Sequence, residues 1–186
     1  MATLFEGGLL ILALMSGWVF SINPLEHWRL EGVGLTVALL GVLPLYVPLT
    51  RVLNRPCELA WVNEIKQLMI QMLGDCLRQC RRRELLYVAG LAGVAEEVFF
   101  RGLLQAGLEQ EFGLPSALLF SNLLFAAVHW VTPGYALLAG GAGLYLGISL
   151  YFTGEPNLLI PVVIHAVYDY LALQGFSKVC PTARTS

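Results

Sequence analysis

The stretch LYVAGLAGVAEEVFFRGLLQAGL, residues 86–108, has the length and apolar character of a membrane-spanning helix, yet it carries Glu96 and Glu97 side by side near its middle. About 20 apolar residues are enough for a helix to cross the hydrocarbon core of a bilayer. An ionised carboxylate at the centre of such a helix costs about 2.5–3.5 kcal/mol on insertion scales. Two adjacent acids at this depth therefore indicate a buried polar site, in which other ionisable groups of the chain compensate them.

The composition of the whole chain is typical of a multi-spanning membrane protein. Of its 186 residues, 57% are hydrophobic and 13% are charged, whereas soluble domains carry about 25% charged residues. The length suits one helical bundle and is too short for two sizeable domains. The net charge of −2 gives no indication of a nucleic-acid partner, so none is expected.

These patterns predict an all-α bundle of about six transmembrane helices in a single membrane domain, 1–186. The apolar segments, separated by Gly, Pro or polar clusters, lie at 4–22, 32–50, 85–108, 114–131, 135–153 and 157–174. Residues 1–84 would supply N-terminal spans and an amphipathic helix, and residues 85–174 the helical core that carries the chemistry. No basic region precedes the first segment, so we interpret it as a retained helix rather than a signal peptide.

The segment between the second and third predicted spans holds seven of the eleven Lys and Arg residues. They are Arg51, Arg55, Lys66, Arg78 and Arg81–Arg83. The positive-inside rule places this segment in the cytosol, and six spans then place both termini there as well. Apolar residues from Trp61 to Cys80 recur at three-to-four spacing, which predicts an amphipathic helix on the inner leaflet. Such a helix either gates a substrate or only links two spans.

We therefore expect a multi-pass protein of a prokaryotic plasma membrane in contact with the lipid bilayer, with an internal photosynthetic membrane as the alternative location. The four cysteines are Cys57, Cys76, Cys80 and Cys180. No second Cys or His pair accompanies Cys76 and Cys80, so a zinc finger is not indicated and the cysteines are interpreted as reduced apolar residues. The oligomeric state is not predicted by any of these features.

Different roles are expected for the two adjacent acids. Glu97 and Arg101 are four residues apart, so they can pair along one face of the helix. Glu96 is turned about 100° away from Glu97. It therefore points elsewhere, free of Arg101, and is the candidate working carboxylate.

Two later spans carry imidazoles. His129 shares a helix face with Phe125, and His165 lies one turn from Asp169. Asp169 can fix the tautomer of His165, or both can coordinate one group. A carboxylate such as Glu96 can act as general base on a water that it shares with a His, and His165 with Asp169 can stabilise charge on a carbonyl oxygen.

A metal-dependent route stays open alongside this one. Two His and one carboxylate form a common catalytic zinc set, and Glu96, His129 and His165 supply those ligand types. The HExxH motif of many soluble zinc proteases is absent. A Zn²⁺ ion is therefore an alternative, and no other cofactor is expected.

Three motifs on late apolar segments resemble those of one known family. Glu-Glu-x-x-x-Arg begins at Glu96, Phe-x-x-x-His begins at Phe125, and His-x-x-x-Asp begins at His165. Together they resemble the CPBP family of intramembrane proteases, which are related to type II CAAX prenyl endopeptidases. The resemblance covers about residues 85–174 and implies an endopeptidase acting on a membrane-associated peptide or protein, lipidated or not.

The resemblance also implies roles by position. Glu96 and His129 would activate the water, with Glu97 and Arg101 in support, and His165 would stabilise the oxyanion. Many members have Asn at the position that is Asp169 here, so this residue would act in protonated form, orient His165 or bind metal. Metal-dependent and glutamate-dependent hydrolysis are both compatible with the resemblance.

Alternatives without proteolysis remain at this point. Relatives in the family include bacteriocin-immunity factors, and buried acids with His also suit a proton-coupled transporter, although the inverted repeats of transporters are not evident. A scaffold with a purely structural polar cluster is the third hypothesis. The protease hypothesis requires Glu96 and His129 to meet, although they lie at different predicted depths. Glu96 lies roughly 17 Å along its helix from Leu85, whereas His129 lies near the cytosolic end of its own span. We therefore expect a site in the cytosolic half, reached by tilting or protrusion of the third helix.

Overall fold

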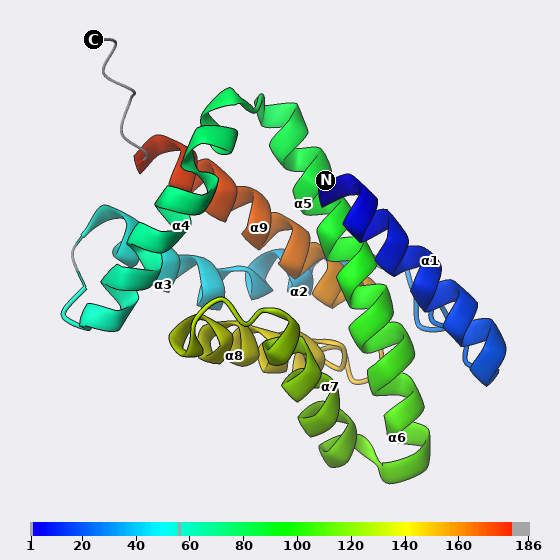
Figure 1. Ribbon diagram of the computed structural model, residues 1–186. Helices are drawn as coiled ribbons and strands as arrows, with labels where there is room; N and C mark the ends of the chain where they lie inside the picture. Colours follow the sequence, from blue (N-terminus) through cyan, green and yellow to red (C-terminus); the bar gives the residue numbers. More distant parts are fainter. Residues whose placement is uncertain (1, 56, 180–186) are drawn as a thin grey trace, which may run out of the picture.

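The protein forms helices joined by short connections in a computed structural model that describes residues 2–55 and 57–179 (Figure 1). No strand occurs in these residues, which confirms the all-α prediction. In chain order the helices are α1 (Ala2–Phe20), α2 (Gly32–Gly41), α3 (Leu43–Asn54), α4 (Ala60–Gln79), α5 (Arg82–Glu97), the π-helix η1 (Val98–Gln105), α6 (Ala106–Phe112), α7 (Leu114–Val128), α8 (Pro133–Ser149) and α9 (Leu159–Val179). Cys57, Cys76 and Cys80 form no disulfide, and Cys180 lies outside the described residues.

The outer surface of the bundle is apolar. Three stretches, Thr3–Phe20, Gly32–Asn54 and Leu159–Val179, are long and apolar enough to cross a membrane, and α7 is a shorter apolar helix. Large side chains such as Trp18 (85% exposed) and Leu137 (70% exposed) point away from the core. A surface of this kind is hydrated at high cost in water and is stable in lipid, so this is a membrane protein. The number of spans and their orientation stay predictions.

The predicted span at 32–50 is a bent pair of helices. α2 ends at Gly41, and α3 begins at Leu43 with Pro44 in its first turn. Proline has no backbone N–H, so Pro44 cannot donate to the preceding turn and the helix is interrupted there. Around Val42 two backbone hydrogen bonds join residues that are three apart instead of four. Val42 N donates to Leu39 O, and Leu45 N donates to Val42 O.

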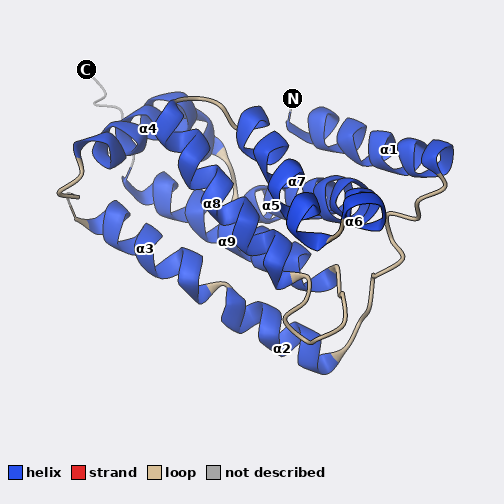
Figure 2. Cartoon of the chain, turned by 90° about the horizontal axis from the view of Figure 1, so that it is seen from below, coloured by secondary structure: helices blue, strands red, loops and turns tan. Residues whose placement is uncertain are grey.

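Helix α9 lies at the centre of the bundle and contacts α2, α3, α4, α5 and α8 (Figure 2). Its first turns supply the core, where Ile160 and Ile164 pack against Ala38 of α2 and Leu146 of α8. Later in the helix, the residues that pack against α5 include the predicted site residue His165. The predicted segment at 157–174 is therefore the element around which the others are placed.

The backbones of α5 and α9 approach each other closely. A Cβ atom on Gly93 would lie 2.8 Å from Ala166 N and 2.9 Å from Ala166 Cβ. Only a glycine allows two helix backbones to come this near. Gly93 precedes the paired acids by one turn and Ala166 follows His165, so this contact sets the distance between the acids and that imidazole.

Helix α4 confirms the predicted amphipathic helix, and its apolar face is turned to the bundle. Val62, Ile65 and Leu77 are buried, and the helix contacts α3, α8 and α9. The Nζ of Lys66 donates to two carbonyl oxygens at the end of α3, those of Val52 and Leu53, each at 2.8 Å. A cation at this position neutralises the free carbonyls of a helix C-terminus, so Lys66 ties α4 to α3.

Candidate functional site

Helix α5 ends in the two acids, and Glu97 is sealed inside the bundle. Its side chain has no exposed surface, and its Oε1 accepts a bond of 3.1 Å from Arg101, also buried, on the next turn. Arg101 donates with its other terminal nitrogen to the carbonyl oxygen of Gly143 in α8, at 2.5 Å. The predicted contact between Glu97 and Arg101 is thus present, and it extends to a second helix.

The turn that carries Arg101 is a π-helix of eight residues. Single π-turns often mark functional sites, because they widen the helix and redirect side chains. On the turn after Arg101, Gln105 is also buried and donates to the carbonyl oxygen of Gly147, at 3.2 Å. Two polar side chains of η1 thereby bind two glycine carbonyls, one turn apart, of α8. Nothing in the sequence indicates the π-helix.

His165 in α9 is held by Glu97. Its Nδ1 lies 2.7 Å from Glu97 Oε1, the same oxygen that accepts from Arg101. The carboxylate of Asp169 faces the other ring nitrogen, Nε2, at 3.5 Å, which is longer than an ordinary hydrogen bond. Asp169 and His165 are thus neighbours, as the spacing predicts, and the role of Asp169 stays a prediction. The Nδ1 proton of His165 is held by Glu97, which comes from another helix.

His129 is held by its own helix. It stands at the end of α7 with φ −91° and ψ 18°, the sparsely populated bridge region of the backbone. Its Nδ1 lies 2.8 Å from the carbonyl oxygen of Phe125, and its ring stacks on the Phe125 ring with centroids 4.3 Å apart. Because a carbonyl oxygen only accepts, Nδ1 carries the proton. The shared face of Phe125 and His129 that the spacing predicts is observed.

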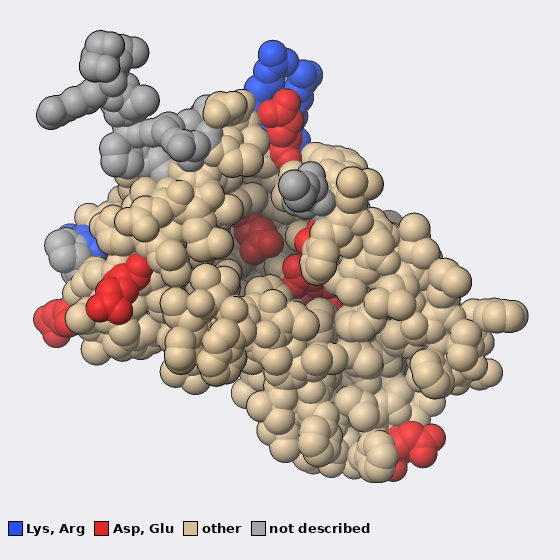
Figure 3. Space-filling model, in the orientation of Figure 1, with Lys and Arg blue, Asp and Glu red and all other residues tan. Residues whose placement is uncertain are grey.

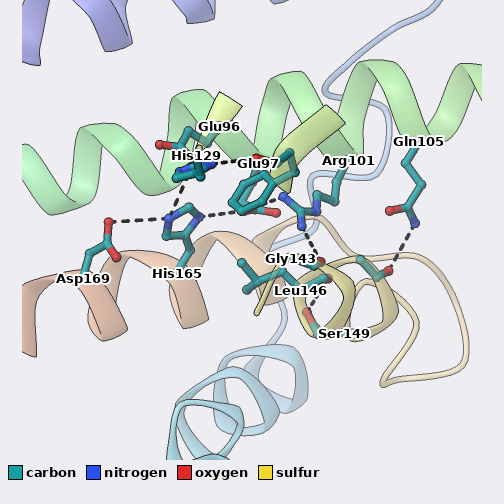
Figure 4. Close-up of polar contacts among 12 residues, drawn as sticks. Glu96, Glu97, Arg101, Gln105, His129, Gly143, Leu146, Ser149, His165 and Asp169 are labelled. Atoms are coloured by element: carbon teal, nitrogen blue, oxygen red, sulfur yellow. Dashed lines mark hydrogen bonds and ion pairs between the residues drawn. The ribbon is translucent and has the colours of Figure 1, made fainter. Parts of the chain in front are cut away.

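The side chains of His129 and His165 converge on that of Glu96, as predicted (Figure 4). Its Oε2 lies 3.6 Å from His129 Nε2 and 4.0 Å from His165 Nε2. Both rings already donate through Nδ1, so in their neutral forms both Nε2 atoms are acceptors. Oε2 itself is buried, and no described residue forms a hydrogen bond with it. With both rings neutral, these three acceptors face one another beyond direct bonding distance, a geometry suited to one small shared donor such as water. When His165 is protonated, its Nε2–H becomes a donor toward the same space.

The side chains of the site differ in their exposure. Glu97 is completely covered, whereas the side chains of Glu96, His129 and Asp169 are 12%, 25% and 32% exposed. Figure 3 shows acidic atoms inside a hollow near the centre of the face drawn there, with no Lys or Arg atoms visible in it. Glu96 and His129 therefore have surface that a reactant can contact, and Glu97 has none.

The same three side chains can be compared with the ligands of a zinc site. The ligand types fit zinc, since Glu96 offers an oxygen and His129 and His165 offer Nε2 lone pairs. Ligands at about 2.0–2.2 Å in a tetrahedron are about 3.3–3.6 Å apart, and the separation of 4.0 Å between Glu96 and His165 exceeds this range. Among the described residues, no group of three His, Cys, Asp or Glu side chains is placed to hold a metal ion. As they stand, these three do not fit zinc.

Several residues near the site were missed by the sequence reasoning. Gly93, Gln105 and Gly143 act through packing or backbone carbonyls, and no spacing rule singles them out. Glu6 is different, because it is an acid within the apolar helix α1, 8% exposed, and the test applied to Glu96 would have found it.

A groove of about 690 Å³ lies beside this cluster. It is lined by the α4 residues Trp61, Asn63, Glu64, Ile65, Gln67, Leu68 and Gln71 and by Thr132, Pro133 and Gly134 at the start of α8. None of the predicted site residues lines it. Its nearest lining residue in sequence, Thr132, follows His129 by three residues, so the groove lies outside the polar cluster itself.

Comparison with known proteins agrees with this arrangement. No curated protein and no solved structure matches the chain. The model of one family, described as type II CAAX prenyl endopeptidase Rce1-like, matches residues 83–171, which include all three motifs. The resemblance seen in the motifs is thereby confirmed, since residues 83–171 are similar to the Rce1-like type II CAAX prenyl endopeptidases.

Proposed function

We propose that this protein is an intramembrane endopeptidase in which Glu96 is the general base and His129 is its partner in activating water. One observation carries the proposal, namely that Glu96 Oε2 faces the Nε2 atoms of two imidazoles whose Nδ1 atoms are already bonded elsewhere. The family match to residues 83–171 supports the same class of activity.

The proposed reaction follows from these positions. A water held between Glu96 Oε2 and His129 Nε2 gives a proton to Glu96 while its oxygen attacks the carbonyl carbon of the substrate. His165, in its protonated form, presents Nε2–H and stabilises the negative charge that develops on the carbonyl oxygen. The proton on Glu96 then passes to the leaving amine, so the peptide bond is replaced by a carboxyl and an amino group.

The supporting residues keep this arrangement rigid. Glu97 holds the His165 ring through Nδ1, and Arg101 neutralises Glu97 within the bundle. Asp169 lies at the exposed side of His165. We propose that it orients His165 or the substrate from there. The substrate is a membrane-associated peptide or protein, because the hollow lies in a bundle whose outer surface is apolar.

The test is a peptidase assay on purified protein in lipid nanodiscs, with candidate substrates identified by comparing the proteomes of cells with and without the protein. Glu96→Gln is the test variant. Glu155→Gln is the matched control, since Glu155 is exposed, lies between α8 and α9 and belongs to none of the three motifs. We expect Glu96→Gln to lower kcat by about 10²–10⁴-fold, the usual contribution of a general base, and Glu155→Gln to leave it unchanged.

Two further measurements separate this proposal from a metal-dependent mechanism and from a transporter. Assays with a chelator and with added Zn²⁺ decide whether a metal is required, and the water mechanism described here predicts activity in chelator. Proton flux is measured in sealed vesicles with the same variants. Cleavage that persists in Glu96→Gln would refute the assignment. A proton flux that depends on Glu96, without hydrolysis, would establish a transporter instead.

A further inference from the structure

Glu6 of α1 occupies a position where an apolar residue would be expected. The inward face of this helix consists of residues 6, 10, 13 and 17, at helical spacing. Ala13 and Leu10 on this face pack in the core with Val98 of η1 and Val162 of α9. Glu6 continues the same face one turn toward the N-terminus and is 8% exposed. It is therefore directed at the bundle and away from the lipid.

The end of this face is next to the polar cluster. Glu6 is close enough to His165, Asp169 and Glu96 to interact with them electrostatically. Its Oε2 is buried and has no hydrogen-bond partner among the residues that the structure describes. Burying a carboxylate oxygen without a partner costs about 1–3 kcal/mol or more, so an acid at this position needs a compensating group.

The described residues do not provide a free basic side chain for this purpose. Arg101 is bound to Glu97 and to the Gly143 carbonyl, and Lys66 is bound to carbonyls of α3. The remaining described Lys and Arg side chains are exposed on the surface. With Glu97 neutralised by Arg101, the acids Glu6, Glu96 and Asp169 face only two imidazoles. Carboxyl groups therefore outnumber basic side chains around the hollow, which favours a cationic group over an anionic one.

The spacing of the acids favours one type of cation. A metal ion needs its ligand atoms about 3 Å apart, and no three acidic or imidazole groups are so placed among the described residues. An ammonium or guanidinium group has N–H donors that point outward, so it binds carboxylates that are farther apart. Charge-assisted bonds of this kind are about twice as strong as neutral ones.

We propose that Glu6 and Asp169 form an acidic subsite that binds a positively charged side chain, Lys or Arg, of the substrate beside the cleaved bond. The inference rests on the proposed peptidase function and adds the substrate preference of that site. Glu6 supplies the buried end of the subsite and Asp169 its exposed end, at 32% side-chain exposure. The acidic hollow in Figure 3 is the entrance for this side chain.

The test compares matched substrates that differ in one charge. Peptides carry Arg, or citrulline as its neutral isostere, on either side of the cleaved bond. For the wild type, we expect kcat/KM to be at least tenfold higher with Arg on one side. In Glu6→Gln this Arg-to-citrulline ratio falls toward one, whereas Glu155→Gln keeps it. A wild-type ratio near one, or an unchanged ratio in Glu6→Gln, would overturn the proposal.

A binding measurement keeps the proposal testable apart from hydrolysis. Arginine amide is titrated into wild-type protein, Glu6→Gln and the charge-preserving Glu6→Asp, after each is checked for a monodisperse elution profile. Saturable binding that is lost in Glu6→Gln and weakened in Glu6→Asp supports the subsite even if no peptide is cleaved. Equal binding, or no binding, by all three proteins contradicts it. Cleavage without any Arg preference disproves the subsite and leaves the peptidase function intact.

Discussion

Glu97 joins three helices through one oxygen atom. Its Oε1 accepts from Arg101 on η1 and from His165 Nδ1 on α9, and Arg101 continues to the Gly143 carbonyl of α8. All three side chains are buried. A buried ion pair of this kind adds little net stability, but removal of one partner leaves an isolated charge in the core. The fixed orientation of His165 is the functional gain from this arrangement.

Removing Arg101 alone should be far more damaging than removing both charges. Arg101→Leu leaves Glu97 ionised without a cation, which we expect to lower the free energy of unfolding by about 3–5 kcal/mol. The double variant Glu97→Met/Arg101→Leu should recover much of this stability and none of the activity, because His165 Nδ1 then has no partner. Thermal unfolding and the peptidase assay together measure the two effects. Equal stability of the single and double variants would contradict the assignment.

At the scale of helices, the site depends on the contact of α5 with α9. Gly93 and Ala166 bring the two backbones close enough for Glu97 to reach His165. A larger residue at position 93 must push the helices apart. A shift of about 1 Å in catalytic groups can cost on the order of 100-fold in rate.

Gly93→Val and Gly90→Val form a matched pair on the same helix. A Cβ at Gly93 meets Ala166, whereas a Cβ at Gly90 has no atom within 4 Å. We expect Gly93→Val to lower activity by at least tenfold and stability by about 1–3 kcal/mol, the usual cost of overpacking. Gly90→Val has the same intrinsic helix propensity and should leave both nearly unchanged. Similar losses in the two variants would show that the contact does not control the site.

The sequence predicted the helices well because apolar length and turn residues act locally. Its errors have local causes too: Pro44 interrupts the second segment, and the third continues through η1 to Phe112. The site residues were found because each motif places two polar groups one turn apart in an apolar helix. The bond between Glu97 and His165 could not be predicted, because spacing within one helix does not tell which acid faces another helix. The exact cytosolic depth of the site stays a prediction.

At the scale of the whole molecule, α4 and α3 close one side of the bundle around α9. Lys66 joins them through two carbonyl oxygens at the end of α3. The groove of about 690 Å³ lies between α4 and the start of α8. The attachment of α4 to α3 therefore helps to set the width of this groove.

Lys66→Met should loosen α4 and leave the other helices in place. The variant keeps most of the side-chain length and loses the charged donor, so we expect a loss of about 1–2 kcal/mol. Lys178→Met, at an exposed position in the last turn of α9, is the control. Hydrogen exchange should become faster in residues 60–79 of Lys66→Met and stay unchanged in the control. Exchange that rises throughout the chain would indicate general destabilisation instead.

The groups that bind the charged side chains of residues 82–112 are synthesised later than this segment itself. Gly143 and His165 follow Arg101 by 42 and 64 residues, so a ribosome that has just produced this segment has not yet supplied them. Its charges then have only one another, at a cost of about 2.5–3.5 kcal/mol for each uncompensated group in the bilayer. During biosynthesis, the translocation machinery must therefore shelter this segment until α8 and α9 have been synthesised. Chains truncated before residue 143 should be substrates for membrane quality control.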